Sequence, residues 1–138
     1  MTDPEIKELL LNAKTIAVVG ASDKPWRDSG KIMEYLMKSG YVVFPVNPAY
    51  KTVLGKTCYP TVHDIPVKPG TIDIVDIFRN PEFVMPVVED AIAIGARVVW
   101  MQLTVVNEEA KKKAEDAGLR VVMDRCILVE RKRLIDWV

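Results

Sequence analysis

At 138 residues the chain has the length of one domain, and we expect a single domain over residues 1–138. Its 19 basic side chains balance 19 acidic ones, so no excess positive charge favours nucleic acid or an anionic membrane surface. A hydrophobic share of 49% with 28% charged residues excludes a disordered or fibrous chain. No apolar run reaches the ~20 residues that a membrane span needs.

The chain begins Met1-Thr2-Asp3, which is unlike a secretion signal. Its two cysteines, Cys58 and Cys126, lie far apart and form no CxxC motif. We therefore expect free thiols and a cytoplasmic protein. One histidine in the whole sequence is too few for a typical zinc site, and we expect no metal.

Short apolar runs bounded by glycine, proline or asparagine predict strands that are buried on both faces. The predicted strands cover residues 15–19, 41–46, 72–78, 97–101 and 119–123. Capped or amphipathic segments predict helices around them. These helices are expected to begin near Asp3, Asp28, Asn80 and Asn107, with a last helix over residues 130–137. Pro86 lies inside the helix that follows Asn80, so a kink or a later start is expected there.

The alternation of strands and helices predicts an α/β fold of three layers, Rossmann-like, with a five-stranded parallel sheet and helices on both faces. Right-handed crossovers and two half-units favour the strand order 3-2-1-4-5. Ligands of such sheets bind outside the carboxyl ends of the strands, where the strand order reverses. The functional residues are therefore expected in the loops at 20–29, 47–52, 78–81, 102–106 and 124–126.

The loop after the first strand begins with the glycine of a phosphate-binding turn, Gly20. It lacks the second and third glycines of the dinucleotide fingerprint, which bring the backbone close to a pyrophosphate. Ser22, Lys24 and Arg27 would instead meet phosphates with their side chains. The alternative is a plain turn that carries solvated charges.

The loop after the second strand has no acidic residue where NAD sites hold the ribose. Asn47 can bond a ribose or an adenine edge, Tyr50 can pack on a base, and Lys51 can neutralise a ribose phosphate. A ligand like NADP or CoA therefore fits better than NAD, unless Asn47-Pro48 is only a turn that ends the strand.

The remaining loops offer binding groups more readily than catalytic ones. Phe78 and Arg79 can form the wall and the cationic rim of an adenine or pyrophosphate pocket, although Phe78 can equally belong to the core. Gln102 can point into the crevice. His63 stands beside Asp64 without an identifiable nucleophile, and Cys126 has no base in view, so we expect no catalytic residue.

Five motifs taken together resemble the small stand-alone CoA-binding proteins of the Rossmann type. Those proteins are similar in turn to the N-terminal domain of succinyl-CoA synthetase alpha subunits. The motifs are Gly20-Ala21-Ser22, Pro45-Val46-Asn47-Pro48, Leu54-Gly55 with Cys58-Tyr59-Pro60, Trp100-x-Gln102, and Met123-Asp124-Arg125-Cys126. The likeness extends over nearly the whole chain.

The resemblance implies that CoA or an acyl-CoA lies in the crevice. It assigns Gly20, Ala21, Ser22 and Arg27 to the pyrophosphate, Asn47, Pro48 and Lys51 to the adenosine phosphate, Phe78 and Arg79 to the nucleotide wall, and Gln102 to the pantetheine. Two departures from the family pattern stand out. Thr104 occupies a position that is often glycine, and Glu130 is followed by Arg131 where histidine is common.

The resemblance further implies a binding module, acting as a carrier, a sensor or a partner subunit. The phosphorylated histidine of the synthetase lies outside the CoA-binding domain, so no catalysis is implied for this chain. Two alternatives stay open: an enzyme that uses NADP or another nucleotide, and a thiol-dependent CoA-redox protein that uses Cys126. The sequence leaves open a protein partner.

Overall fold

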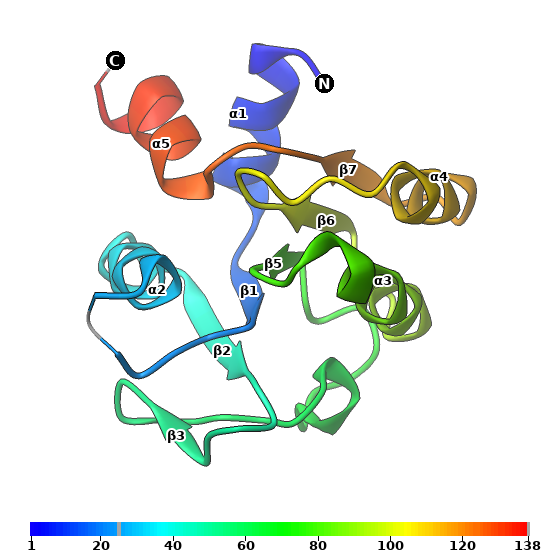
Figure 1. Ribbon diagram of the computed structural model, residues 1–138. Helices are drawn as coiled ribbons and strands as arrows, with labels where there is room; N and C mark the ends of the chain where they lie inside the picture. The colour runs from blue at the N-terminus through cyan, green and yellow to red at the C-terminus, as the bar shows by residue number, and fades with distance from the viewer. Residues whose placement is uncertain (25, 138) are drawn as a thin grey trace.

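The computed structural model describes residues 1–24 and 26–137, and Pro25 and Val138 lie outside the described residues (Figure 1). The principal helices are α1 (Asp3–Asn12), α2 (Asp28–Lys38), α3 (Val84–Ala93), α4 (Glu108–Asp116) and α5 (Ile127–Arg131). The strands are β1 (Thr15–Val19), β2 (Val42–Val46), β3 (Thr52–Val53), β4 (Lys56–Thr57), β5 (Ile74–Ile77), β6 (Val98–Met101) and β7 (Arg120–Val122). Short 3₁₀ turns cover Val62–Asp64 and Pro81–Phe83, and a π-helical turn, Lys132–Asp136, follows α5.

Five strands form one parallel sheet between two layers of helices, which confirms the predicted fold class. Figure 1 shows α1, α2 and α5 on one side of the sheet and α3 and α4 on the other. Each side encloses its own apolar core. Trp100, Ile16 and Met33 are buried under the first group of helices, whereas Val75 and Val88 are buried under the second.

The strand order is β2-β1-β5-β6-β7, and the predicted order 3-2-1-4-5 is therefore wrong. In sequence numbering the observed order is 2-1-3-4-5, so the third major strand pairs with the first instead of the second. The chain leaves β1 toward one side for β2 and then returns past β1 to form β5. The reversal of strand order consequently lies between β1 and β5, where a ligand crevice is expected.

Pro45 explains why β2 is an edge strand. Among the described residues, the outer side of β2 pairs through a single parallel bridge. In this bridge the Tyr59 amide donates to the Pro45 carbonyl (3.0 Å) and the Asn47 amide donates to the Tyr59 carbonyl (2.9 Å). Proline has no N–H to give to a neighbouring strand on that side, so a full strand cannot pair there. This signal was present in the sequence and argues against the predicted order, in which the second strand has a neighbour on both sides.

Two helix starts refine the sequence prediction. Pro86 is the third residue of α3, which begins at Val84 after a 3₁₀ turn, so the later start is confirmed. A residue in the first helical turn needs no N–H for the helix. The last helix begins at Ile127 instead of the predicted residue 130, because the Gln102 side chain accepts a hydrogen bond from the Ile127 amide (3.1 Å).

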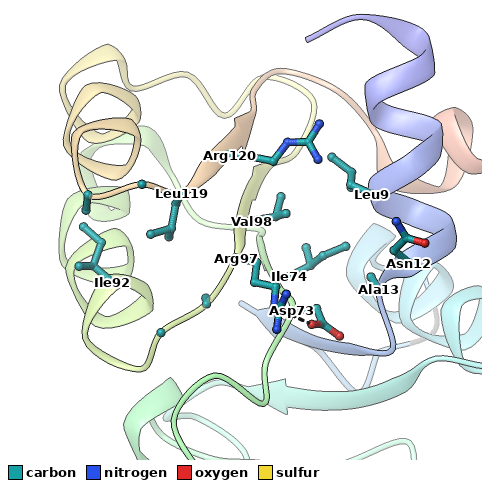
Figure 2. A pocket seen from close by; sticks show the side chains of 14 residues that line it. Leu9, Asn12, Ala13, Asp73, Ile74, Ile92, Arg97, Val98, Leu119 and Arg120 are labelled. Carbon is teal, nitrogen blue, oxygen red and sulfur yellow. Dashed lines mark ion pairs between the residues drawn. The ribbon is translucent and has the colours of Figure 1, made fainter.

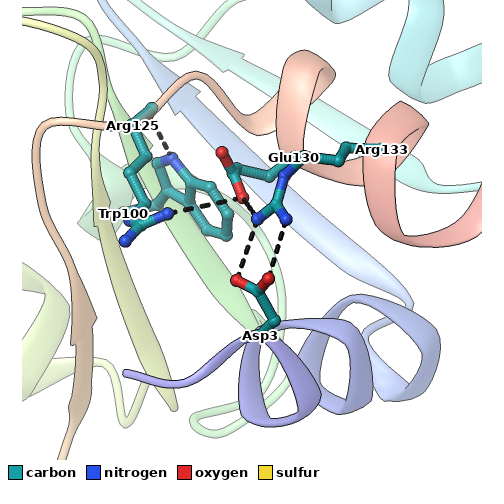
Figure 3. Close-up of polar contacts among 5 residues, drawn as sticks. All are labelled: Asp3, Trp100, Arg125, Glu130 and Arg133. Carbon is teal, nitrogen blue, oxygen red and sulfur yellow. Dashed lines mark hydrogen bonds and ion pairs between the residues drawn. The ribbon is translucent and has the colours of Figure 1, made fainter.

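A network of charges joins the first and last helices (Figure 3). The Arg133 guanidinium donates to both carboxylate oxygens of Asp3 (2.7 and 2.9 Å) and to the buried carboxylate of Glu130 (2.5 Å). Arg125 lies 3.6 Å from the same Glu130 carboxylate, and its carbonyl accepts a hydrogen bond from the Trp100 indole (2.8 Å). The loop after β7 is therefore anchored both to the core and to the helix layer.

Across the described residues, the helices are all too short or too polar to cross a membrane.

Candidate functional site

Gly20 lies at the point where the strand order reverses. Its amide donates to the Val46 carbonyl (2.8 Å), and the Phe78 amide donates to the Val19 carbonyl (2.8 Å). Hydrogen bonds therefore connect the ends of β1, β2 and β5. Gly20 has a φ of +88°, and a Cβ at this position would lie 2.2 Å from the Phe78 carbonyl oxygen. The loop can cross the end of β5 this closely only because the residue is glycine.

A polar hollow of about 350 Å³ opens beside this crossing. It is lined by Gly20, Ser22, Arg27, Asp28, Ser29, Asn47, Tyr50 and Phe78. The first turn of α2 therefore faces the hollow, and among the described residues no side chain caps the helix at Arg27. The start of an 11-residue helix carries partial positive charge and first-turn N–H groups, so it can hold an anion.

The loop that enters the hollow folds tightly against α2. The Ser22 hydroxyl is buried and accepts a hydrogen bond from the Lys24 amide (3.2 Å). A Cβ on Gly30 would lie 3.1 Å from the Lys24 carbonyl oxygen and 3.3 Å from that of Ser22. The small residue at Gly30 thus lets the loop approach the helix start.

Asn47 clamps the first and second loops to each other. Its Nδ2 donates to the Ala21 carbonyl (2.8 Å), and its Oδ1 accepts from the Ala49 amide (2.9 Å). The Cys58 thiol lies 3.4 Å from the Asn47 carbonyl, and burial raises the pKa of that thiol. The loop that follows β2 is therefore held in place before any ligand arrives.

A second hollow of about 220 Å³ adjoins the first and shares Gly20 and Asn47 with it. It is lined by Val19, Gly20, Val46, Asn47, Pro48, Pro60, Thr61, Val62, Arg79, Phe83, Pro86, Val87 and Asp90. Its lining is mainly valine and proline, so we call it the apolar hollow. The Arg79 guanidinium lies over the Phe83 ring, 5.2 Å from its centroid. A flat, largely apolar group with a polar rim matches such walls.

The structure brings together seven of the ten residues expected at the site. Gly20, Ser22, Arg27, Asn47 and Phe78 line the polar hollow, and Pro48 and Arg79 line the apolar hollow. The other three residues lie outside the linings. Ala21 is fully buried, Lys51 is exposed and its carbonyl accepts from the Cys58 amide (2.8 Å), and Gln102 is buried where its side chain caps α5. Cys126 also lies outside both linings and precedes α5 as its N-cap residue.

Sequence reasoning missed most of the apolar hollow. Pro60, Thr61 and Val62 come from the turn-rich passage, and Asp90 comes from the middle of α3. No local pattern marks these residues, because their approach depends on how the long passage between β2 and β5 packs. Ser29, in the first turn of α2, could have been found from the predicted helix start.

Thr104 adopts a strained backbone in the loop after β6. Its φ is +70°, in the left-handed region, and its amide donates to the Asp124 carboxylate (2.7 Å), a residue that itself has a φ of +60°. Left-handed φ values are unfavourable for a β-branched residue and cost nothing for glycine. The glycine that is common at this position in the proteins the chain resembles therefore has a conformational reason.

The Thr104→Gly variant is expected to be more stable than the wild type, with a free energy of unfolding about 1 kcal/mol higher, because the backbone strain is relieved. Urea unfolding measures the change. Val106→Gly is the matched control: this exposed residue of the same loop lies outside the left-handed region, and its replacement should lower stability. An equal loss in both variants would contradict the assignment of strain.

A third hollow, of about 540 Å³ and larger than the other two, lies at the opposite edge of the sheet, where the strands begin (Figure 2). Its central carboxylate, Asp73, already accepts hydrogen bonds from the Lys14 and Thr15 amides (2.8 and 3.1 Å) and lies 3.6 Å from the Arg97 guanidinium. The polar groups at this edge hold the strand starts together. The carboxyl edge, with its helix start and its adjoining hollows, is the stronger candidate site.

Within the described residues, no group of three or more His, Cys, Asp and Glu side chains is arranged to hold a metal ion.

Comparison with known proteins identifies relatives of the chain. Residues 14–132 match the family model described as a CoA binding domain. The chain is 41% identical over 125 residues to "Uncharacterized protein YneT" of Bacillus subtilis, a match that covers 91% of this chain and 90% of that protein. It is also 31% identical over 139 residues to a 4-hydroxybutyrate–CoA ligase (ADP-forming) of Nitrosopumilus maritimus. That match covers 92% of this chain but only 19% of the ligase.

Two solved structures of similar length share the fold. A hypothetical protein from Pyrococcus horikoshii OT3 is 51% identical, with a TM-score of 0.93 over 98% of this chain and 93% of that one. A protein from Thermus thermophilus is 36% identical, with a TM-score of 0.90 over 98% of this chain and 100% of that one. The likeness to both extends over nearly the full length of each chain.

Proposed function

The chain belongs to the family of CoA-binding domains, and from that premise we propose that it binds coenzyme A or an acyl-CoA across the two adjoining hollows. The observation that carries the proposal is the pairing of a polar hollow at the start of α2 with an apolar hollow that shares its rim. Coenzyme A has both chemistries in one molecule, because a pyrophosphate links a flat adenosine to the pantetheine arm.

The polar hollow suits the pyrophosphate. The first-turn amides of α2 and the Arg27 guanidinium supply donors and positive charge, and Ser22 and Ser29 supply hydroxyl groups nearby. Gly20 keeps the floor of the hollow free of a side chain. From there the arm would pass Tyr50 and Phe78, which line the same hollow and present aromatic surface to it.

The apolar hollow suits the adenine. Pro48, Pro60 and Val62 offer flat apolar surface, and Arg79 places a cation at the rim. Lys51 directly follows Tyr50 in the exposed part of the second loop, and we assign it to the ribose 3′-phosphate. These roles are binding roles, so we propose a carrier, sensor or partner subunit. The two free thiols, Cys58 and Cys126, are consistent with the cytoplasmic location that we also propose.

Coenzyme A is expected to raise the melting temperature of the protein, because a ligand that binds only the folded state stabilises it. The shift should exceed those caused by 3′-dephospho-CoA, NAD and NADP at equal concentration. Arg27→Ala should weaken CoA binding about 10- to 100-fold in titration calorimetry, the usual effect of losing a charge-assisted contact.

Arg97→Ala is the matched control for Arg27, since it removes the same charge at the opposite edge of the sheet and should leave the dissociation constant unchanged. Lys51→Ala should reduce the preference for CoA over 3′-dephospho-CoA. A larger thermal shift with NADP than with CoA would overturn the proposal in favour of a nucleotide-dependent enzyme.

A further inference from the structure

The apolar hollow contains one acidic side chain among its described lining residues, Asp90. It lies in the middle of α3, and its side chain is 33% exposed. A carboxylate in a wall made mainly of valine and proline, with Arg79 as its one cationic side chain among the described lining residues, loses part of its hydration. A carboxylate in such a wall needs a hydrogen-bond or ion-pair partner.

His63 is the partner of Asp90. Its Nε2 lies 2.9 Å from Asp90 Oδ1, which fixes the direction of the carboxylate. His63 sits in the 3₁₀ turn Val62–Asp64, and the neighbouring Val62 is buried in the wall of the hollow. The same contact therefore joins the turn-rich passage to α3 at the hollow.

Asp64, the neighbour of His63 in sequence, makes its hydrogen bonds with Thr61 instead of with His63. Its Oδ2 accepts hydrogen bonds from the Thr61 amide (3.0 Å) and the Thr61 hydroxyl (2.9 Å), which closes a capping box around the turn. The histidine consequently pairs across the fold with Asp90. Among the described residues, Asp90 Oδ2 accepts no hydrogen bond, so one oxygen is left as an acceptor.

We propose that Asp90, oriented by His63, recognises the 6-amino group of the adenine base and so selects adenine over other purines. This inference rests on the proposed function. Adenine presents an N–H donor at its 6-position, whereas hypoxanthine and guanine present a carbonyl oxygen at the same place. A carboxylate attracts the first and repels the second, and a donor held by a charged acceptor is worth more than a neutral contact. The apolar walls hold any purine, and Asp90 distinguishes among them.

The test compares CoA with its deamino analogue, in which hypoxanthine replaces adenine, by titration calorimetry on the intact chain. The wild type is expected to bind CoA about 10- to 100-fold more tightly than the analogue. In Asp90→Asn the preference should fall to less than about 3-fold, because an amide can offer either an oxygen or an N–H group. His63→Ala should retain part of the preference, since the carboxylate remains but is no longer oriented.

Glu89→Gln is the matched control. This neighbouring acid on α3 pairs with Lys113 at the surface (2.8 Å) and lies outside the lining of the hollow, so the preference should be unchanged. Melting curves confirm that each variant is folded. Failure of the wild type to bind CoA would overturn the proposed function and this inference together. Tight CoA binding without any preference over the analogue, or a preference that survives Asp90→Asn, would overturn this inference alone.

Discussion

Gly20→Ala is expected to lower the free energy of unfolding by about 3 kcal/mol, the sum of a left-handed backbone penalty and an overpacking penalty. The new methyl group would lie 2.2 Å from the Phe78 carbonyl oxygen, a backbone atom that moves only if the end of β5 moves. Displacement of that strand end also reshapes both hollows, so CoA binding should be lost along with stability. Urea unfolding and titration calorimetry measure the two effects.

Gly40→Ala separates the two penalties. Gly40 follows α2 with a φ of +97°, and a Cβ there would meet no described atom within 4 Å. The free energy of unfolding of this variant should therefore fall by only about 1 kcal/mol, the penalty of the left-handed backbone alone. The variant should bind CoA as tightly as the wild type. Equal losses of stability in Gly20→Ala and Gly40→Ala would show that a methyl group at position 20 does not clash with the Phe78 carbonyl.

The second large expected effect is on stability, and it comes from the buried carboxyl of Asp76. It lies in the central strand β5 between Val18 and Trp100, is fully buried, and has no hydrogen-bond partner for either carboxylate oxygen among the described residues. Burial raises the pKa of this carboxyl well above its ordinary value. The folded protein therefore retains a proton that the unfolded chain releases.

Stability should consequently fall as the pH rises. Below about pH 4 the Asp76 carboxyl is neutral in both states, so its titration does not change the stability there. Above that pH the unfolded chain ionises while the folded protein holds its proton, and stability falls by about 1.4 kcal/mol per pH unit until the pH passes the raised pKa. Asp76→Asn removes this titration, so at pH 7 the variant should be more stable than the wild type, and near pH 3 this difference should disappear.

Urea unfolding at pH 3, 5 and 7 checks this pH dependence. Asp73→Asn is the control, because Asp73 accepts hydrogen bonds from two backbone amides and its replacement should lower stability at neutral pH. A loss of stability in Asp76→Asn at pH 7 would mean that the Asp76 carboxylate is ionised and held by a polar group.

The sequence predicted the parts of the fold that depend on local pattern. Buried runs such as residues 15–19 became strands because their apolar side chains need cover on both faces. Gly20, Arg27 and Arg79 follow strands or begin a helix, so the parallel sheet itself gathers them at one edge.

The rest depended on contacts between distant segments. The strand order required attention to Pro45, whose missing N–H outweighs the usual preference for two symmetric half-units. Gln102 was expected in the crevice from its place after β6, but α5 begins three residues earlier than predicted and takes the side chain as its cap. Asp90 lies on a helix whose pattern indicates only an apolar face, so nothing in its neighbourhood predicted a role in the site.

The hydrogen bond between Tyr59 and Pro45 affects the association of one copy of the protein with another. An uncovered edge strand is a template on which a second molecule can add its own strand, and such additions are a route to insoluble aggregates. At this edge the Pro45 carbonyl already accepts from Tyr59, and proline itself offers nothing to donate. The addition of a further strand beside this end of β2 is therefore disfavoured, which works against edge-to-edge association at this margin of the molecule.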